Sequence, residues 1–183
     1  MAHFLQDIVA LLLFFCSTIH KTLVMNTLPK LNFPQFEFKT RNNGGKDEIF
    51  DMARKKYVAL TPEEWVRQHV LHYLHFCKNY PLELIQVEGS ITLNGLAKRF
   101  DIAAYSKAIK PLLLVECKQT SVPISQKTFD QASRYNIVLD VPYLLISNGL
   151  QHFCFSIDKT ENKFVYHSEI PSWDELNNIQ KCN

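Results

Sequence analysis

The chain has 183 residues, of which 46% are hydrophobic and 21% charged, a composition typical of a globular protein with a sizeable core. One such core commonly serves roughly 100–200 residues, so the length favours a single domain. The net charge is only +2, which excludes a strongly basic protein, and any nucleic-acid binding must come from a local site. The scattered cysteines form no CxxC pair, which argues against a zinc knuckle or disulfide scaffold and favours a cytoplasmic protein.

Residues 1–24 are far more apolar than the rest of the chain, but polar residues interrupt them. Their longest apolar run extends from Ile8 to Cys16, whereas a membrane-spanning helix needs about 20 residues. A secretory signal needs a basic start, and here Lys21 is the first Lys or Arg. We therefore predict that translation starts at Met25, that residues 1–24 take no part in the fold and that no membrane is involved. The alternatives are an N-terminal helix packed on the domain, or a signal peptide or anchor that tethers the protein to a membrane.

Residues 25–60 contain prolines and the turn cluster Asn42-Asn43-Gly44-Gly45, which predict an irregular lead-in with one or two short strands. Residues 61–183 are expected to form the folded domain. Its first helix begins at Thr61-Pro62-Glu63-Glu64, where an N-cap, a proline and two acidic residues coincide. Asn79-Tyr80-Pro81 ends this helix after about Lys78. Its core-facing stripe should comprise Val66, Val70, Tyr73, Leu74 and Cys77.

From Leu84 onward the hydrophobic pattern has a period of two, which is typical of strands. Asn94-Gly95 predicts a two-residue hairpin turn, and a second turn near residues 107–110 completes an antiparallel meander. Ser125 can cap a helix that reaches about Leu139. A buried strand at 141–149 and two edge strands at 152–157 and 163–168 follow. The expected fold is an α/β sandwich with a mixed sheet.

Three charged residues of the meander are expected to lie together. Glu116 and Lys118 are two apart on one strand and therefore point to the same face. If the turn is centred between residues 108 and 109, paired positions sum to 217, and Asp101 lies opposite Glu116 with Cβ atoms about 5 Å apart. Two like charges there destabilise a sheet unless a cation bridges them, and Mg²⁺ suits carboxylate oxygens. Lys118 is then placed to orient a metal-bound water or neutralise a phosphate.

Each of these residues also has an ordinary interpretation, because Asp, Glu and Lys are common on exposed strand faces. Two features favour a site. The strand is apolar until its end, so the charges appear where a buried strand emerges. The following helix adds Gln131 and Tyr135, which share one face because they are four residues apart.

The ordered set of residues resembles the PD-(D/E)xK nuclease superfamily. Asp101, Glu116 and Lys118 fit its D-x(n)-E-x-K signature, and Gln131 to Tyr135 looks like the QxxxY element of its RecB-like and type I restriction branch. With the TPEEWVRQ helix and the LLISNG strand, roughly residues 45–160 are similar to the N-terminal nuclease domain of type I restriction enzyme R subunits.

The resemblance implies a restriction-endonuclease-like α-β-β-β-α-β core, with a mixed central sheet flanked by helices. It also implies hydrolysis of DNA phosphodiester bonds with Mg²⁺, for which Mn²⁺ would substitute. By position, Asp101 and Glu116 would bind the metal and Lys118 would assist the attacking water. Gln131 and Tyr135 would support the site or touch the DNA backbone.

Some positions depart from the pattern of the superfamily. Phe100 stands at the position of the proline in the motif name PD-(D/E)xK, although Arg99-Phe100-Asp101 is like the R-x-D form of the type I restriction branch. The acid that many members carry on the first helix is best matched by Glu64, with Glu63 and Glu88 as rivals. R subunits continue into a motor with a P-loop, whereas this sequence contains no GxxxxGK[ST] motif, so we expect a stand-alone nuclease module without a nucleotide cofactor.

Other candidate sites receive less support. His69, His72 and His75 are three residues apart, a spacing that spreads their rings around the helix, so surface or partly packed histidines are favoured over a metal cluster. Basic residues near the proposed site are candidates for phosphate contacts, although a solvated rim explains each one equally well. The candidates for DNA contacts are Arg99, Lys127 and Arg134.

The leading hypothesis is a Mg²⁺-dependent DNA nuclease, with other restriction or repair subunits as candidate partners. The alternative is a catalytically silent nucleic-acid-binding or complex-forming module of the same fold. The intact set of Asp101, Glu116 and Lys118 favours the nuclease, because a silent module has no chemical need for all three.

Overall fold

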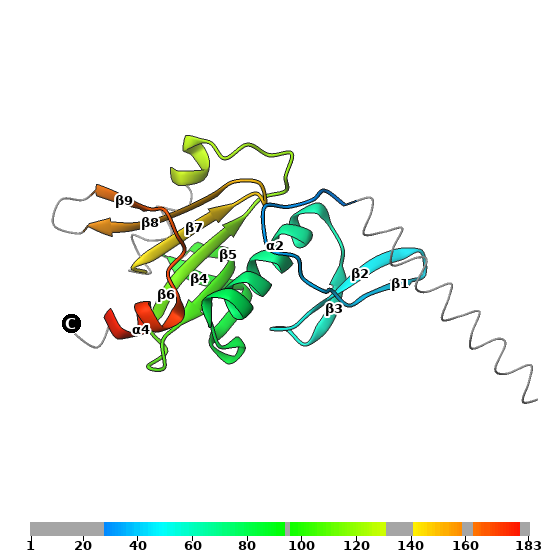
Figure 1. Cartoon of the computed structure of the whole chain (residues 1–183), viewed down its shortest axis with the longest axis horizontal. Helices are drawn as coiled ribbons and strands as arrows, with labels where there is room; N and C mark the ends of the chain where they lie inside the picture. Colours follow the sequence, from blue (N-terminus) through cyan, green and yellow to red (C-terminus); the bar gives the residue numbers. More distant parts are fainter. Residues whose placement is uncertain (1–27, 94–95, 131–140, 159–162, 180–183) are drawn as a thin grey trace, which may run out of the picture.

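A computed structural model describes residues 28–93, 96–130, 141–158 and 163–179, with the side chains of residues 91–98 left out (Figure 1). It shows a mixed α/β fold with two sheets. The elements, in chain order, are β1 (Thr40–Asn43), β2 (Lys46–Asp51), β3 (Lys56–Ala59), α2 (Pro62–His72), the π-helical turn Tyr73–Cys77, the 3₁₀ turn Leu82–Leu84, β4 (Ile85–Leu93), β5 (Leu96–Tyr105), β6 (Pro111–Cys117), β7 (Tyr143–Ser147), β8 (His152–Asp158), β9 (Lys163–His167) and α4 (Trp173–Ile179).

The larger sheet has six strands in the order β4-β5-β6-β7-β8-β9. All neighbouring strands are antiparallel except β6 and β7, which run parallel, so the predicted mixed sheet is confirmed. A parallel pair needs a long crossover, and the chain between these two strands enters a helix at residues 126–130. The remainder of the predicted helix, including Gln131 and Tyr135, lies outside the described residues.

The predicted register of the β5–β6 hairpin is confirmed next to the candidate site. Ile102 pairs with Val115 and Ala104 with Leu113, so the paired positions sum to 217. The register shifts between Ala104 and Tyr105, nearer the turn, where Ile109 has a positive φ of 57°. In the β4–β5 hairpin Leu93 pairs with Leu96, and the predicted turn at 94–95 lies outside the described residues.

Helix α2 begins as predicted. The side chain of Thr61 accepts a hydrogen bond from the backbone N–H of Glu64 at 3.1 Å, and Pro62 is the first helical residue. The helical backbone continues through the π-helical turn to residue 78. Cys77 is exposed, so its predicted place in the core stripe is wrong: the π-helical turn winds more residues per turn and rotates the last positions away from the core.

The core has two parts, one on each face of the large sheet. On one face, α2 contributes Val66 and Val70, which belong to the same buried cluster as Ile102 and Val115 of the sheet. The other face holds a smaller cluster that includes Leu114 and Leu144. The central strands are therefore buried on both sides, which explains their apolar sequences.

Residues 28–60 are more regular than predicted, since they form three strands instead of one or two. Strands β1, β2 and β3 make a separate antiparallel sheet, and Gly44 and Gly45 supply the positive φ angles of the β1–β2 turn. Residues 33–39 form no strand, and their aromatic side chains pack against α2. Phe38, for example, lies with its ring centroid 4.6 Å from that of His69.

Two further features concern the ends of the chain. The C-terminal helix α4 was not predicted. Residues 1–27, which include the apolar extension and Met25, lie outside the described residues. No helix within the described ranges has the length and apolar character of a membrane span.

Candidate active site

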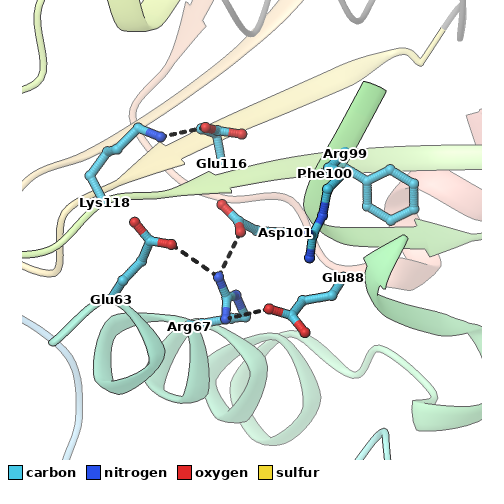
Figure 2. Close-up of a pocket in the computed structure, with 8 residues that line it drawn as sticks. All are labelled: Glu63, Arg67, Glu88, Arg99, Phe100, Asp101, Glu116 and Lys118. Carbon is cyan, nitrogen blue, oxygen red and sulfur yellow. Dashed lines mark hydrogen bonds and ion pairs between the residues drawn. The ribbon is translucent and has the colours of Figure 1, made fainter. Parts of the chain in front are cut away.

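A pocket of about 340 Å³ lies between the N-terminal half of α2 and strands β4 to β6 (Figure 2). It brings Asp101, Glu116 and Lys118 together, as the sequence predicted, and adds Arg99 at the same opening. The complete lining consists of Glu63, Arg67, Glu88, Arg99, Phe100, Asp101, Glu116 and Lys118.

Glu116 and Lys118 form the shortest ion pair among the residues that line the pocket. The Lys118 Nζ atom donates to Glu116 Oε1 at 2.5 Å, and Glu116 is only 8% exposed. Burial raises the pKa of Glu116, and the nearby charge of Asp101 raises it further. Burial alone would lower the pKa of Lys118, but its hydrogen bond and charge contact with Glu116 raise it. Lys118 is therefore an ammonium group at neutral pH.

Asp101 is fixed from two directions. Its Oδ2 atom accepts a hydrogen bond from the backbone N–H of Cys117 at 2.6 Å, which ties it to the strand that carries Glu116 and Lys118. Its Oδ1 atom accepts from Arg67 Nη2 at 2.8 Å, which ties it to α2. The carboxylate is thus oriented by the protein itself.

Arg67 is a buried residue of the site that the sequence analysis missed. Its guanidinium forms ion pairs with the carboxylates of Glu63 at 3.2 Å, Glu88 at 3.3 Å and Asp101 at 2.8 Å (Figure 2). It also forms an ion pair with the carboxylate of Glu64. Burial would lower the pKa of Arg67, but the charges of Asp101 and Glu64 raise it above its usual value. The helical spacing of residue 67 from residues 63 and 64 was the one available indication.

A second arginine, Arg54, reaches two of the same acids, Glu64 and Glu88, from the turn between β2 and β3. It contacts Asp51 at 2.7 Å, Glu64 at 2.7 Å and Glu88 at 2.5 Å. Glu64, our preferred helix acid, is 4% exposed and held by both guanidinium groups, and it does not line the pocket. Its rivals Glu63 and Glu88 do line it.

Glu88 has an unusual backbone for a strand residue. Its φ is 52°, in the left-handed region that residues other than glycine rarely occupy. The neighbouring pairs Val87–Ile102 and Gly89–Phe100 keep the β4–β5 register on both sides of it. Such local strain is found where the surrounding contacts fix the conformation, and here Arg54 and Arg67 hold the carboxylate.

The other predicted residues in the described part of the chain do not line the pocket. Lys127 is exposed in the helical segment 126–130. Gln131, Arg134 and Tyr135 lie outside the described residues. His69 and His72 are buried, so the prediction of surface or partly packed histidines is wrong for these two. Each Nδ1 atom lies within 2.9 Å of a carbonyl oxygen of the preceding helical turn, and both rings pack against Phe38.

The chemistry of Asp101 and Glu116 fits a divalent cation. Carboxylate oxygens are hard ligands, and Mg²⁺ commonly takes one or two of them and keeps several waters. In the part of the chain that the structure describes, no three or more His, Cys, Asp or Glu side chains are grouped to hold a metal ion. A cation held by Asp101 and Glu116 would need water or phosphate oxygens to complete its shell.

Residues 62–171 match the family model of the type I restriction enzyme R protein N terminus (HSDR_N), which covers more than half of the chain. The chain belongs to this family. The matched region starts at the first residue of α2 and contains every residue that lines the pocket, whereas the sheet β1-β2-β3 lies before it.

A solved structure is also similar, namely a fragment assigned to an HsdR subunit of a type I restriction enzyme from Vibrio vulnificus YJ016. The TM-score is 0.48 and the sequence identity 23%, over 64% of this chain and 24% of that chain. This member of the R-protein family thus spans about a quarter of that structure's length. A search of curated proteins finds no match.

Proposed function

We propose that this R-protein family member is a metal-dependent nuclease module that hydrolyses DNA phosphodiester bonds. The observation that carries the proposal is the convergence of Asp101, Glu116 and Lys118 in one pocket. Family membership supports a restriction nuclease, and the described elements fit an α-β-β-β-α-β core of the restriction-endonuclease type. We propose that its partners are other subunits of a restriction complex and that it acts in the cytoplasm.

In this proposal Asp101 and Glu116 hold Mg²⁺, with Mn²⁺ as a substitute. The pKa of Glu116 is raised by burial and by the charge of Asp101, and a divalent cation would relieve the repulsion between the two carboxylates. When bound, the metal supplies Lewis acidity for water activation and charge for the phosphate.

The protein's own groups supply orientation and charge. Lys118, held as an ammonium, donates to the attacking water or to a phosphate oxygen and stabilises the negative charge that develops there. The N–H of Cys117 keeps Asp101 facing the site. We further propose that Gln131 and Tyr135 support the site. Arg99, Lys127 and Arg134 are proposed to contact phosphates. Glu64 acts only through the two arginines that it binds.

A catalytically silent DNA-binding module is the second candidate, and one observation favours it. Both oxygens of Asp101 already accept hydrogen bonds from the protein, and one donor is the positively charged Arg67. An acid neutralised in this way has less need of a metal ion.

Cleavage assays separate the two candidates. The full chain is incubated with supercoiled, linear or single-stranded DNA in Mg²⁺, Mn²⁺ or EDTA, beside Lys118→Met and the exposed control Lys110→Met. A nuclease cuts in either metal, not in EDTA, and loses at least about 100-fold of its rate in Lys118→Met, as expected for a group that stabilises transition-state charge. Folded wild-type protein that cuts none of these DNAs would support the silent module.

A further inference from the structure

The small sheet β1-β2-β3 concentrates positive charge. Residues 39–59 contain six basic and three acidic residues, a net charge of +3, against +2 for the whole chain. This segment lies before the region matched by the family model. The basic residues are Lys39, Arg41, Lys46, Arg54, Lys55 and Lys56.

Most of this charge has no acidic partner in the part of the chain that the structure describes. Asp51 is buried and bound by Arg54, and Arg41 pairs with Glu48 at 2.6 Å. The four lysines are exposed, and none makes an ion pair with another described residue. They are Lys39, Lys46, Lys55 and Lys56.

The outward face of the sheet adds aromatic rings to these cations. Phe50 and Tyr57 are paired across β2 and β3, with ring centroids 5.2 Å apart. The guanidinium of Arg41 lies 4.1 Å from the Tyr57 ring centroid, and Lys39 Nζ lies 5.8 Å from that of Phe50. Ile49, next to Phe50 on β2, is fully buried, so Phe50, Tyr57 and Arg41 share the face that points away from the core. Lys56 pairs with the buried Asp51 and belongs to the opposite face, and Lys55 lies in the β2–β3 turn. Cations combined with half-exposed aromatic rings are typical of nucleic-acid-binding surfaces.

The sheet is also joined to the pocket. Arg54, in the β2–β3 turn, contacts Glu88, which lines the pocket. Lys55 and Lys56 follow Arg54 directly in the sequence, and both are exposed. Figure 1 shows the small sheet on one side of α2, and the large sheet on the other. Duplex DNA carries one negative charge per about 1.7 Å of axis, so a duplex at the pocket presents phosphates to both regions.

We propose that the sheet β1-β2-β3 binds the phosphate backbone of DNA that flanks the pocket, with Lys55 and Lys56 nearest the site. The contacts are with phosphates and not base edges, so they carry affinity and not sequence preference. The inference rests on the proposed function in taking DNA as the polyanion, but it does not require catalysis.

Fluorescence anisotropy of a labelled duplex tests the proposal. Binding of the full chain is measured in EDTA at several salt concentrations, for wild type, Lys55→Gln/Lys56→Gln and the matched control Lys107→Gln/Lys110→Gln on the distant β5–β6 turn. Removing one cation that touches a phosphate lowers the steepness of log K against log salt concentration by about 0.9. For Lys55→Gln/Lys56→Gln we therefore expect a slope less steep by about 1.8 and an affinity about tenfold weaker than that of the wild type. The control should stay within about twofold of wild type, since exposed charges distant from bound DNA contribute little.

The outcomes separate this inference from the nuclease proposal. If Lys55→Gln/Lys56→Gln binds like the control, or if the wild-type chain binds no duplex in EDTA, the sheet is not a DNA-binding surface, whatever the cleavage assays show. If the variant loses affinity as expected while the wild type cuts no DNA in Mg²⁺, the surface stands and the nuclease proposal fails.

Discussion

Replacing Arg67 with methionine tests how far the buried ion pairs hold the pocket together. Methionine keeps much of the apolar stem of arginine but removes the charge that faces Glu63, Glu64, Glu88 and Asp101. Breaking a buried ion pair by removing one partner commonly costs about 3–5 kcal/mol, because the remaining charge stays buried and unpaired. Glu64 keeps Arg54 and Gln68 as partners, so we expect a loss near 3 kcal/mol, the lower end of that range.

The loss is measured by urea unfolding and by thermal melts, both followed by circular dichroism, in EDTA at pH 7. In a chain of this size, 1 kcal/mol lowers Tm by roughly 2–4 °C, so Tm should fall by about 6–12 °C. Arg99→Met is the matched control: it removes an exposed arginine of the same pocket that makes no ion pair with another described residue. Its effect should stay within about 0.5 kcal/mol, as for most surface substitutions.

Two results would refute this reasoning. One is an Arg67→Met protein within 1 kcal/mol of wild type, a difference small enough to leave the ion pairs without a stabilising role. The other is that the stability losses of Arg67→Met and Glu64→Gln add up in full in the double variant. Because the two residues are in direct contact, the double variant should lose less stability than the sum of the single losses.

Three further predictions concern stability. Glu116→Gln should stabilise the metal-free protein at pH 7, because the raised pKa of Glu116 means that folding disfavours its ionised form. The gain in stability should vanish below pH 4.5, where the carboxyl group is protonated in both states. Thermal melts in EDTA at both pH values test this prediction. Burial lowers the pKa of His69 to about 4, so the folded state should lose up to about 3 kcal/mol of stability as pH falls from 6.5 to 4. His69→Phe should remove this loss and flatten the plot of urea midpoint against pH over that range. An unchanged plot would contradict the prediction. Gly89→Ala should cost about 1–3 kcal/mol in urea unfolding, because a Cβ atom would lie 2.0 Å from Phe100 Cζ, and a neutral result would show that the Phe100 ring moves aside without strain.

Local patterns predicted the parts of the fold that depend on neighbouring residues. The N-cap at Thr61 and the β5–β6 register follow from a few adjacent positions, and both are confirmed. Helix α4 had an equally local indication that we missed. Ser172 and Glu175 form a capping box, in which Glu175 Oε2 accepts from the Ser172 N–H at 2.6 Å.

Long-range contacts explain what the sequence left open. Arg54 is 34 residues from Glu88 in sequence, and nothing in its surroundings indicates that it reaches the acids of the pocket. The choice of helix acid depends on the same contacts, since two guanidinium groups cover Glu64 while Glu63 faces the pocket. Adjacent residues of a helix point in different directions, and tertiary packing decides which of them is free for function.

The most direct test of the central proposal is cleavage of supercoiled plasmid by the full chain in Mg²⁺, compared between wild type and Asp101→Asn. Asparagine keeps the shape of the side chain and its acceptor for the Cys117 N–H but removes the charge that a cation needs. We predict Mg²⁺-dependent cutting by the wild type and a loss of at least about 100-fold in the variant, as expected when electrostatic stabilisation of the transition state is removed. Equal cutting by both proteins would place the chemistry elsewhere, and no cutting by folded wild type would contradict the nuclease assignment.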